Sequence, residues 1–233
     1  MTEADGIGIF DSGVGGLTVL QRLLEAVPRE HLLYLGDTAR HPYGTKSASV
    51  VTRYSVENAE FLMEKGVKMV VVACNTASSV ALDTLRERFA VPVIGVIEPG
   101  ARAAVAASRN RKIGIIGTEA TIASGTYTRA LRALDPNLEI YTRACPLFVP
   151  LAEEGWVDND VTRQTAALYL ASLRKSRIDT LVLGSGYRAT VERLSTGVRD
   201  AVRERVHARL TEGAVRTIET NVLYATAHRP LDG

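Results

Sequence analysis

The chain has 233 residues, 46% of them hydrophobic, and a formal net charge of only +2, so it can bury one large core or two modest ones. Its charges are dispersed and its apolar runs are strand-sized, so neither a nucleic-acid-binding patch nor a membrane span is expected. Because it lacks a signal-peptide pattern and has only two cysteines, a cytoplasmic protein with reduced thiols is expected.

Strand-like apolar runs alternate with amphipathic helical runs, which predicts an α/β fold with mostly parallel sheets flanked by helices. The first strand, 7–10, leads into a glycine-rich turn, 11–16, and a helix, 17–26. The glycine spacing is not that of a dinucleotide fingerprint, so a small carboxylate suits this turn better than a nucleotide. Asp11 is available for acid–base chemistry or, equally, for capping the helix. Further strands are predicted at 32–35, 69–74, 91–97, 112–118, 138–141 and 180–185, and further helices at 49–65, 77–89, 127–134 and 161–175.

The loop 36–46 follows the second strand and lies at the same predicted sheet edge as Asp11. Two interpretations fit its composition. Either it lines a pocket with Tyr43, or it is a solvated surface loop in which Asp37 pairs with Arg40.

Cys74 stands at the carboxyl end of an apolar strand, just before a helix begins. Open α/β sheets bind ligands outside the carboxyl ends of their strands, and a helix N-terminus favours a thiolate through its macrodipole. Cys74 is therefore the predicted reactive group, and a small buried hydrophobic residue is the alternative interpretation.

The second part of the chain repeats the pattern of the first. Ile113 stands 106 positions after Ile7 in matching strands, and Ser185 stands 111 positions after Cys74. Two such similar offsets predict an internal duplication with two α/β halves that face each other. The counterpart of Cys74 is then Ser185, whereas Cys145, which precedes a proline in an apolar stretch, is expected to be structural.

A predicted domain boundary lies at residues 98–100, Glu-Pro-Gly, which interrupt the strand expected over 91–97. We expect residues 1–97 together with 186–233 to form a first domain that carries Cys74. Residues 98–185 are expected to form a second domain. The region after residue 190 is predicted to be mostly helical, with a last strand near 221–227.

A thiolate with a lowered pKa can take the α-proton of an amino acid if the site holds the carboxylate and excludes water. Cys74 is the expected base, and Asp11 is expected to orient or deprotonate it. Ser12, Asn75 and Thr76 are expected to hydrogen-bond the substrate carboxylate and amine. Because one base returns the proton to the face it came from, inversion without a cofactor needs a second acid on the opposite face.

Acyl transfer by a thiol nucleophile is the competing chemistry, and it requires a histidine base. His41 is the only histidine near a predicted site loop, and nothing else in the sequence indicates a Cys–His pair. No cysteine or histidine pair has metal-ligand spacing, so no metal is expected.

Five segments carry a strong resemblance to a known family. They are 8–17 (GIFDSGVGGL), 36–44 (GDTAR and PYG), 73–77 (ACNTA), 116–118 (IGT) and 145–151 (CPLFVPL). Together they resemble the glutamate racemases of the aspartate/glutamate racemase family, and the match covers nearly all of residues 6–184.

The resemblance implies a cofactor-independent isomerase that interconverts L- and D-glutamate and supplies D-glutamate for peptidoglycan, and hence for cell wall biogenesis and cell shape. It also implies two α/β domains with the active site in the crevice between them, and a homodimer. Cys74 would be one catalytic base, assisted by Asp11. The residues expected to contact substrate are Asp11, Ser12, Pro42, Tyr43, Gly44, Asn75, Thr76 and Thr118.

The sequence departs from the family after the strand that ends at Gly184. There the family has a second Cys-Thr-His and then Tyr-Pro, whereas this chain continues with Ser185, Gly186 and Tyr187. A serine hydroxyl is far too weak an acid to replace a thiol, so the simplest interpretation is an internal block missing before Ser185. Three hypotheses stay open: a racemase with an incomplete sequence here, a one-thiol lyase-like or inactive relative, and a non-catalytic protein that binds a carboxylate.

Overall fold

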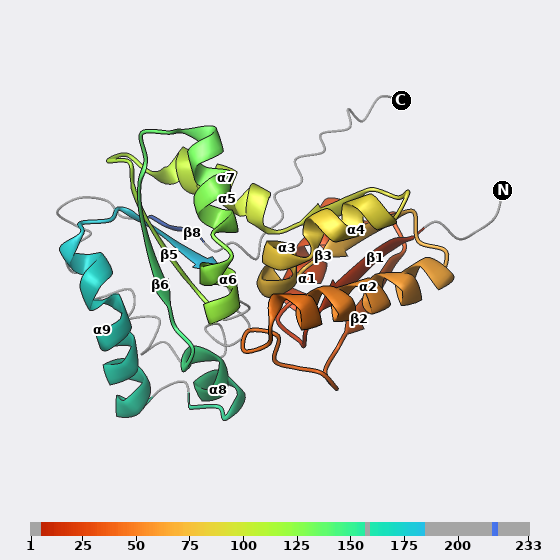
Figure 1. The fold of residues 1–233 in the computed structure, drawn as a ribbon, viewed down its shortest axis with the longest axis horizontal. Helices are drawn as coiled ribbons and strands as arrows, with labels where there is room; N and C mark the ends of the chain where they lie inside the picture. The colour runs from red at the N-terminus through yellow and green to blue at the C-terminus, as the bar shows by residue number, and fades with distance from the viewer. Residues whose placement is uncertain (1–5, 157–158, 185–215, 219–233) are drawn as a thin grey trace.

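The computed structural model of the chain describes residues 6–156, 159–184 and 216–218, and it contains two four-stranded sheets (Figure 1). The first sheet has the strand order β2-β1-β3-β4, and the second has the order β6-β5-β7-β8. The neighbouring strands described in both sheets pair in parallel. The predicted α/β class with two similar halves is therefore confirmed.

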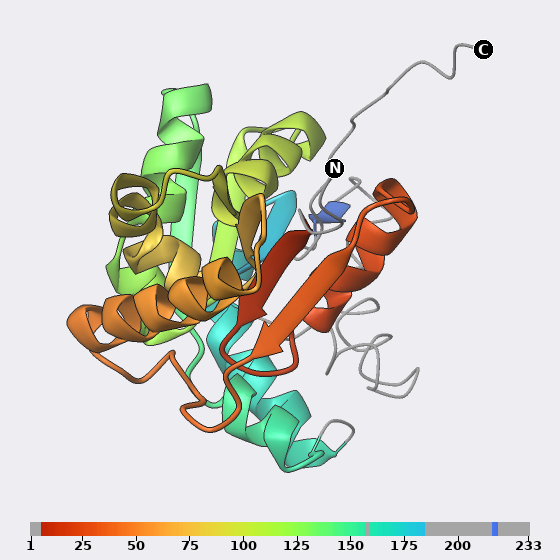
Figure 2. The same ribbon diagram turned by 90° about the vertical axis from the view of Figure 1, so that its right-hand side faces the viewer.

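The first half packs helices on both faces of its sheet, with α1 and α2 on opposite sides (Figure 2). Its strands are β1 (Ile7–Asp11), β2 (Leu32–Gly36), β3 (Met69–Val72) and β4 (Val93–Gly95), and its helices are α1 (Leu17–Ala26), α2 (Ala48–Glu64), α3 (Asn75–Val80) and α4 (Leu82–Arg88). Successive side chains of β1 alternate between two cores: Ile9 packs with Val19 of α1, and Phe10 packs with Leu62 of α2. Because side chains on both faces of the strand are buried, residues 7–10 carry no polar side chain.

The second half is built in the same way. Its strands are β5 (Lys112–Gly117), β6 (Glu139–Ala144), β7 (Thr180–Gly184) and β8 (Arg216–Ile218), and its helices are α5 (Ile97–Ala107), α6 (Glu119–Ala123), α7 (Thr126–Leu134), α8 (Phe148–Glu153) and α9 (Asp160–Lys175). Ile115 of the central strand packs with Leu131 of α7, and Ile116 packs with Leu173 of α9. The two faces of this sheet are therefore covered by different helices.

The strand registers support the predicted duplication residue by residue. In the first sheet Ile7 pairs with Met69, and in the second Ile113 pairs with Thr180. These pairs are related by the same two offsets that the sequence repeat gave. Ser12 and Thr118 therefore occupy equivalent positions, directly after β1 and β5. The counterpart of Cys74 falls at Ser185, which lies outside the described residues.

Two predicted elements near the end of the first half, the helix over 77–89 and the strand over 91–97, were wrong in their bounds. The strand is shorter, Val93–Gly95. The helix expected over 77–89 is two helices, α3 and α4, which meet at Ala81. At this break the Val80 carbonyl accepts a hydrogen bond from the Thr52 hydroxyl of α2, a tertiary contact that periodicity does not reveal. Pro99 does not end the preceding run but lies in the first turn of α5, where a missing backbone N–H costs little.

The expected domain division stays a prediction, with one point of difference. Residues 186–233 were assigned to the first domain, but strand β8 pairs with β7 in the second sheet, with Leu181 opposite Thr217. A short strand far along the chain can join either sheet, and only backbone pairing decides which. The predicted helices after residue 190 and the strand near 221–227 lie outside the described residues.

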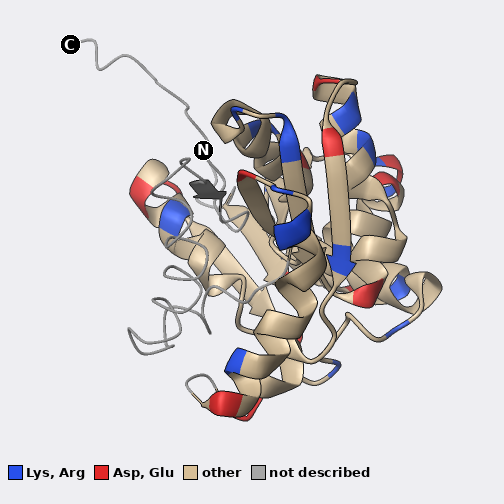
Figure 3. Cartoon of the chain, turned by 90° about the vertical axis from the view of Figure 1, so that its left-hand side faces the viewer, with Lys and Arg blue, Asp and Glu red and all other residues tan. Residues whose placement is uncertain are grey.

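Helices α3 and α6 lie against each other where the two halves meet (Figure 1). Lysines and arginines are interspersed with acidic residues around the second half (Figure 3). Across the described residues, no helix is both long and apolar enough to cross a membrane.

Candidate active site

A cavity of about 260 Å³ lies between the two halves, at the carboxyl ends of β1, β3 and β5. This is where parallel α/β sheets bind ligands, and the volume suits a small molecule rather than a polymer. The residues that line it are Asp11, Ser12, Gly13, Val14, Gly15, Thr38, His41, Pro42, Tyr43, Gly44, Cys74, Asn75, Thr76, Thr118, Val149, Ala152 and Glu153. The set includes all nine residues that the sequence predicted for the site.

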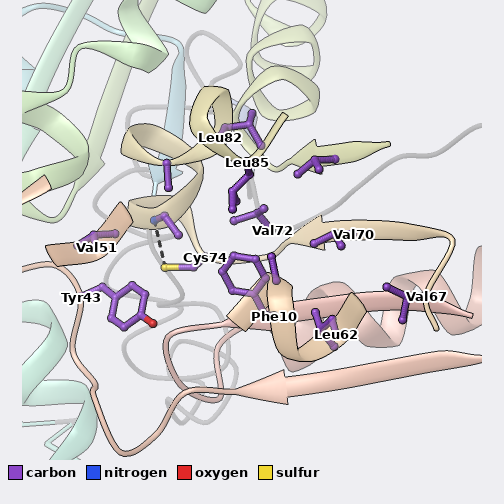
Figure 4. Close-up of a cluster of buried hydrophobic side chains, with 14 residues drawn as sticks. Phe10, Tyr43, Val51, Leu62, Val67, Val70, Val72, Cys74, Leu82 and Leu85 are labelled. Carbon is purple, nitrogen blue, oxygen red and sulfur yellow. Dashed lines mark hydrogen bonds between the residues drawn. The ribbon is translucent and has the colours of Figure 1, made fainter. Parts of the chain in front are cut away.

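Cys74 occupies the N-cap position of α3, with an extended backbone at φ −78° and ψ 121°. The Ala77 N–H donates a hydrogen bond to its sulfur at 3.4 Å, the dashed line in Figure 4. The thiol in turn donates to the Ser12 hydroxyl oxygen at 3.5 Å. In Figure 4 the sulfur lies at the end of the first-half core that is nearest Tyr43. Cys74 is therefore held at the edge of a packed core, facing the cavity.

The expectation of a lowered thiol pKa at Cys74 is wrong. Burial raises the pKa of Cys74 to about 11, and the negative charge of Asp11 adds to the effect. The Ala77 N–H and the Ser12 hydroxyl oppose this shift and lower the pKa, but by less. The helix terminus does favour the thiolate, yet removing the sulfur from water outweighs it. At neutral pH, Cys74 is therefore a thiol in this arrangement.

Asp11 binds its own turn rather than capping the helix. Its carboxylate accepts a hydrogen bond from the Gly13 N–H at 2.9 Å, and Gly16 is the N-cap of α1. Burial raises the pKa of Asp11, although nearby backbone N–H groups and His41 lower it. The Gly13 N–H, which the sequence offered to a ligand carboxylate, is thus bound to Asp11. Gly16 permits the tight turn, because a Cβ there would lie 2.6 Å from the Asp11 Cβ.

The loop after β2 combines both of its predicted interpretations. Arg40 pairs with Asp37 at 2.7 Å, as a solvated loop would have it. Yet Tyr43 is buried, with 1% exposure, and its hydroxyl donates to Asp37 and accepts from the Asn58 amide at 3.0 Å. The Arg40 guanidinium also lies 4.3 Å from the Tyr54 ring centroid. The ion pair therefore anchors the loop that brings Tyr43 to the cavity.

Three threonine hydroxyls join the two halves at the cavity. Thr76 Oγ1 lies 3.1 Å from Thr118 Oγ1 and 3.3 Å from Thr121 Oγ1, and the latter two are 2.9 Å apart. Gly44 packs directly on this cluster, since a Cβ there would lie 2.5 Å from Thr118 Cγ2. Thr121 was missed in the sequence, because the helix that carries it, α6, was not predicted.

His41 and Glu153 close one side of the cavity from opposite halves. The His41 Nδ1–H donates to the Ser12 carbonyl oxygen, 3.2 Å away, and the other ring nitrogen contacts the Glu153 carboxylate. The contacts of the Cys74 sulfur are Ser12 and Ala77, so the arrangement does not support a Cys–His nucleophile. Glu153 was not singled out as a site residue, although it closely follows the segment 145–151 that carried the resemblance.

Cys145 lies outside the cavity lining and is fully buried among Ile116, Leu173 and Leu181. Burial raises its pKa to about 12. The structural role expected from the sequence agrees with this position. Among the described residues, no cluster of three histidine, cysteine or acidic side chains is arranged to hold a metal ion.

Comparison with known proteins gives consistent matches over most of the chain. A family described as Asp/Glu/Hydantoin racemase matches residues 7–212. The chain is 56% identical to the glutamate racemase of Geobacter metallireducens over 188 residues, which is 81% of this chain and 70% of that protein. Its fold matches the glutamate racemase isoform RacE1 of Bacillus anthracis with a TM-score of 0.78 and 36% identity, over 95% of this chain and 87% of that one. It also matches the Francisella tularensis glutamate racemase in complex with D-glutamate, with a TM-score of 0.76 and 34% identity, over 91% and 82%.

Proposed function

This chain belongs to the Asp/Glu/Hydantoin racemase family, and we propose that it is an isomerase that interconverts L- and D-glutamate without a cofactor. One observation supports the thiol chemistry above all. Cys74 lies at the end of a central strand, between the Ser12 hydroxyl and the Ala77 N–H, on a cavity lined by the two halves.

The reaction begins with removal of the substrate α-proton. The Cys74 thiolate forms an S–H bond as the Cα–H bond breaks, and the electron pair moves into the neighbouring carboxylate group. Inversion is complete when an acid on the opposite face gives its proton to the α-carbon and the electron pair returns to form the new C–H bond. In this proposal that acid is a second thiol from the block missing before Ser185. Because burial and Asp11 raise the thiol pKa, the thiolate must form in the complex. The substrate ammonium group provides the positive charge that favours the thiolate, and Asp11, which lines the same cavity as Cys74, is placed to pair with that group.

The described lining contains no lysine or arginine, and its neutral donors are available to hold the substrate carboxylates. Ser12, Asn75, Thr76 and Thr118 supply hydroxyl and amide groups in this part of the cavity.

A second candidate function is proton exchange on one face only. The sequence has only two cysteines, and Cys145 lies buried outside the cavity lining. A chain with one catalytic thiol would take and return the proton on the same face. It would then exchange the α-hydrogen of one enantiomer without inverting it.

Each enantiomer of glutamate, incubated separately in deuterium oxide, tests both functions. Proton NMR follows the α-hydrogen, and polarimetry follows inversion. Exchange with inversion supports the racemase. Exchange from one enantiomer without inversion supports the one-face alternative, and glutamate binding without exchange supports a carboxylate-binding protein. The intact mass of the purified protein is checked first. A mass above that calculated from the 233-residue sequence would indicate a missing internal block, which could supply a second thiol.

We further propose that the D-glutamate supplies peptidoglycan synthesis in the cytoplasm, and that the chain pairs as a homodimer. Depletion of the protein should then produce a cell-wall defect that D-glutamate in the medium relieves. Sedimentation of the purified protein should give twice the mass of one chain, whereas a monomer would contradict the dimer.

A further inference from the structure

Tyr127 of α7 makes a buried hydrogen bond to a residue of the other half. Its hydroxyl donates to the Asn75 Oδ1 at 2.5 Å, although the two residues are 52 positions apart. Tyr127 is 2% exposed and Asn75 is 3% exposed. Asn75 directly follows Cys74 and lines the cavity, whereas Tyr127 is not among the lining residues. The bond therefore connects a core residue of the second half, outside the cavity lining, to a residue of the first half that lines the cavity.

The ring of Tyr127 is fixed in position by the second half. It belongs to the core cluster that includes Ile113 and Leu131. A Cβ on Gly184 would lie 3.1 Å from its Cε2 atom, so the ring packs on the carboxyl end of β7. Tyr127 thus stands between the carboxyl ends of β3 and β7, the two strands that the duplication makes equivalent.

A second contact fixes the same end of α7 on α3. The Thr126 hydroxyl donates to the Ser79 carbonyl at 2.8 Å. Ser79 and Asn75 are four positions apart, so they lie on one face of α3, and the two contacts are one turn apart. The first two residues of α7 therefore hold α3 in a defined orientation relative to the second half.

We propose that Tyr127 is a positioning residue for the substrate, acting through Asn75; this rests on the function proposed above. An amide presents its oxygen and its N–H₂ group in different directions. Because Tyr127 can donate its hydroxyl hydrogen only to the amide oxygen, it holds that oxygen toward α7. The amide N–H₂ is thereby kept as the donor that Asn75 presents on its cavity side, where it binds a substrate carboxylate. The second half in this way controls a binding residue of the first.

The variant Tyr127→Phe removes the hydroxyl and keeps the buried ring. Asn75 then loses the donor to its buried amide oxygen, and with it one of the contacts that orient its side chain, so KM for glutamate should rise about tenfold. Asn75 binds the substrate and transition state alike in this role, so kcat should stay within about twofold. Tyr169→Phe is the matched control, because the Tyr169 hydroxyl accepts from the Leu147 N–H at 3.3 Å and lies away from the cavity lining. It should leave both constants unchanged.

A double-variant cycle separates positioning from a structural role. Asn75→Ala alone should raise KM, and adding Tyr127→Phe should then raise it no further. If Tyr127→Phe raises KM equally in both backgrounds, or lowers kcat without changing KM, the proposal is wrong. Thermal unfolding of each variant shows whether the fold is intact. Thr126→Val removes the hydroxyl that donates to Ser79 and accepts from Arg129, and it keeps the test available if Tyr127→Phe unfolds.

Calorimetric binding of glutamate to the Cys74→Ser variant distinguishes failure of this proposal from failure of the proposed reaction. In that background Tyr127→Phe should weaken glutamate binding about tenfold. If the parent chain shows no exchange but this loss of binding occurs, the positioning role stands and the reaction is wrong. If binding is unchanged, the positioning role is wrong whatever the activity, and if the Cys74→Ser variant binds no glutamate, both are wrong.

Discussion

The Cys74 thiol donates a hydrogen bond to the Ser12 hydroxyl oxygen at 3.5 Å, although 62 positions separate the two residues. The parallel register explains the contact. Phe10 pairs with Val72, and each of the two site residues stands two positions beyond its paired residue. Parallel strands that end together therefore place two segments next to each other: the turn after β1, which carries Ser12, and the helix N-cap after β3, which is Cys74.

Replacing the Cys74 sulfur should abolish proton abstraction while sparing substrate binding. Cys74→Ser should lower the rate of α-hydrogen exchange by about 10³-fold or more, because a serine hydroxyl ionises far too weakly to act as the base. Deuterium exchange followed by NMR measures this loss. Cys145→Ala is the control and should retain exchange, since Cys145 lies in a core outside the cavity lining. Equal losses in both variants would contradict the assignment.

The ionisation of Cys74 should respond to the charge of Asp11. In a Cys145→Ala background, the ultraviolet absorbance of the thiolate should rise with a pKa of about 11. Asp11→Asn removes a nearby negative charge, so the thiolate becomes more favourable and the pKa should fall. An unchanged or higher pKa in Asp11→Asn would show that Asp11 does not act on the thiol.

The raised pKa of Cys74 also has a consequence for stability. The folded chain holds the proton more tightly than the unfolded chain, whose thiol has an ordinary pKa of about 8.5. This contribution to stability is complete below that value and is lost as the pH rises through about 11. Denaturant unfolding across this alkaline range should therefore show a loss of stability in the parent that is smaller in Cys74→Ala.

The buried threonine cluster should contribute to both stability and affinity. Thr121→Val keeps the shape of the side chain but removes a hydroxyl that contacts Thr76 and Thr118. We expect a loss of about 1 kcal/mol in the free energy of unfolding and a several-fold rise in KM. Denaturant titration and steady-state kinetics measure the two effects. Thr142→Val, at an exposed position of β6, is the control and should change neither the free energy of unfolding nor KM. An unchanged KM in Thr121→Val would show that the threonine cluster does not contribute to substrate binding.

Asp179 should stabilise the fold of the second half through the hydrogen bonds that its carboxylate accepts. Its carboxylate accepts from the Arg109 and Asn110 N–H groups at 2.6 and 2.7 Å and from the Ser108 hydroxyl at 2.7 Å. Although burial raises the pKa of Asp179, these hydrogen bonds hold it below its ordinary value. Asp179→Ala should destabilise the chain by roughly 2–3 kcal/mol. Asp160→Ala, at an exposed acid of α9, is the matched control and should cost far less.

The sign of the pH effect at Asp179 follows from its lowered pKa. The stabilisation is present above the ordinary aspartate pKa and is lost as the pH falls through the folded value. The stability difference between the parent chain and Asp179→Ala should therefore shrink in acid. A difference that stays constant down to low pH would mean that the charge of Asp179 is unimportant.

The sequence by itself determined the α/β architecture of the two halves, and it predicted nine of the residues that line the cavity. Local patterns carry that information: buried strands are apolar, turns need glycine, and the repeat after Ile113 reproduces the spacing of the first half. Because parallel strands end at a shared edge, Asp11 and Cys74 could be placed together before their distances were known.

Tertiary structure alone decided what depends on contacts between distant segments. The break at Ala81 follows from the Thr52 contact, and the place of β8 follows from its pairing with β7. The raised pKa of Cys74 has the same origin, because burial by both halves outweighs the local helix terminus that the sequence displays. The bond from Tyr127 to Asn75 likewise exists only because the two halves pack face to face. Desolvation and packing are sums over surrounding atoms, and most of those atoms come from elsewhere in the chain.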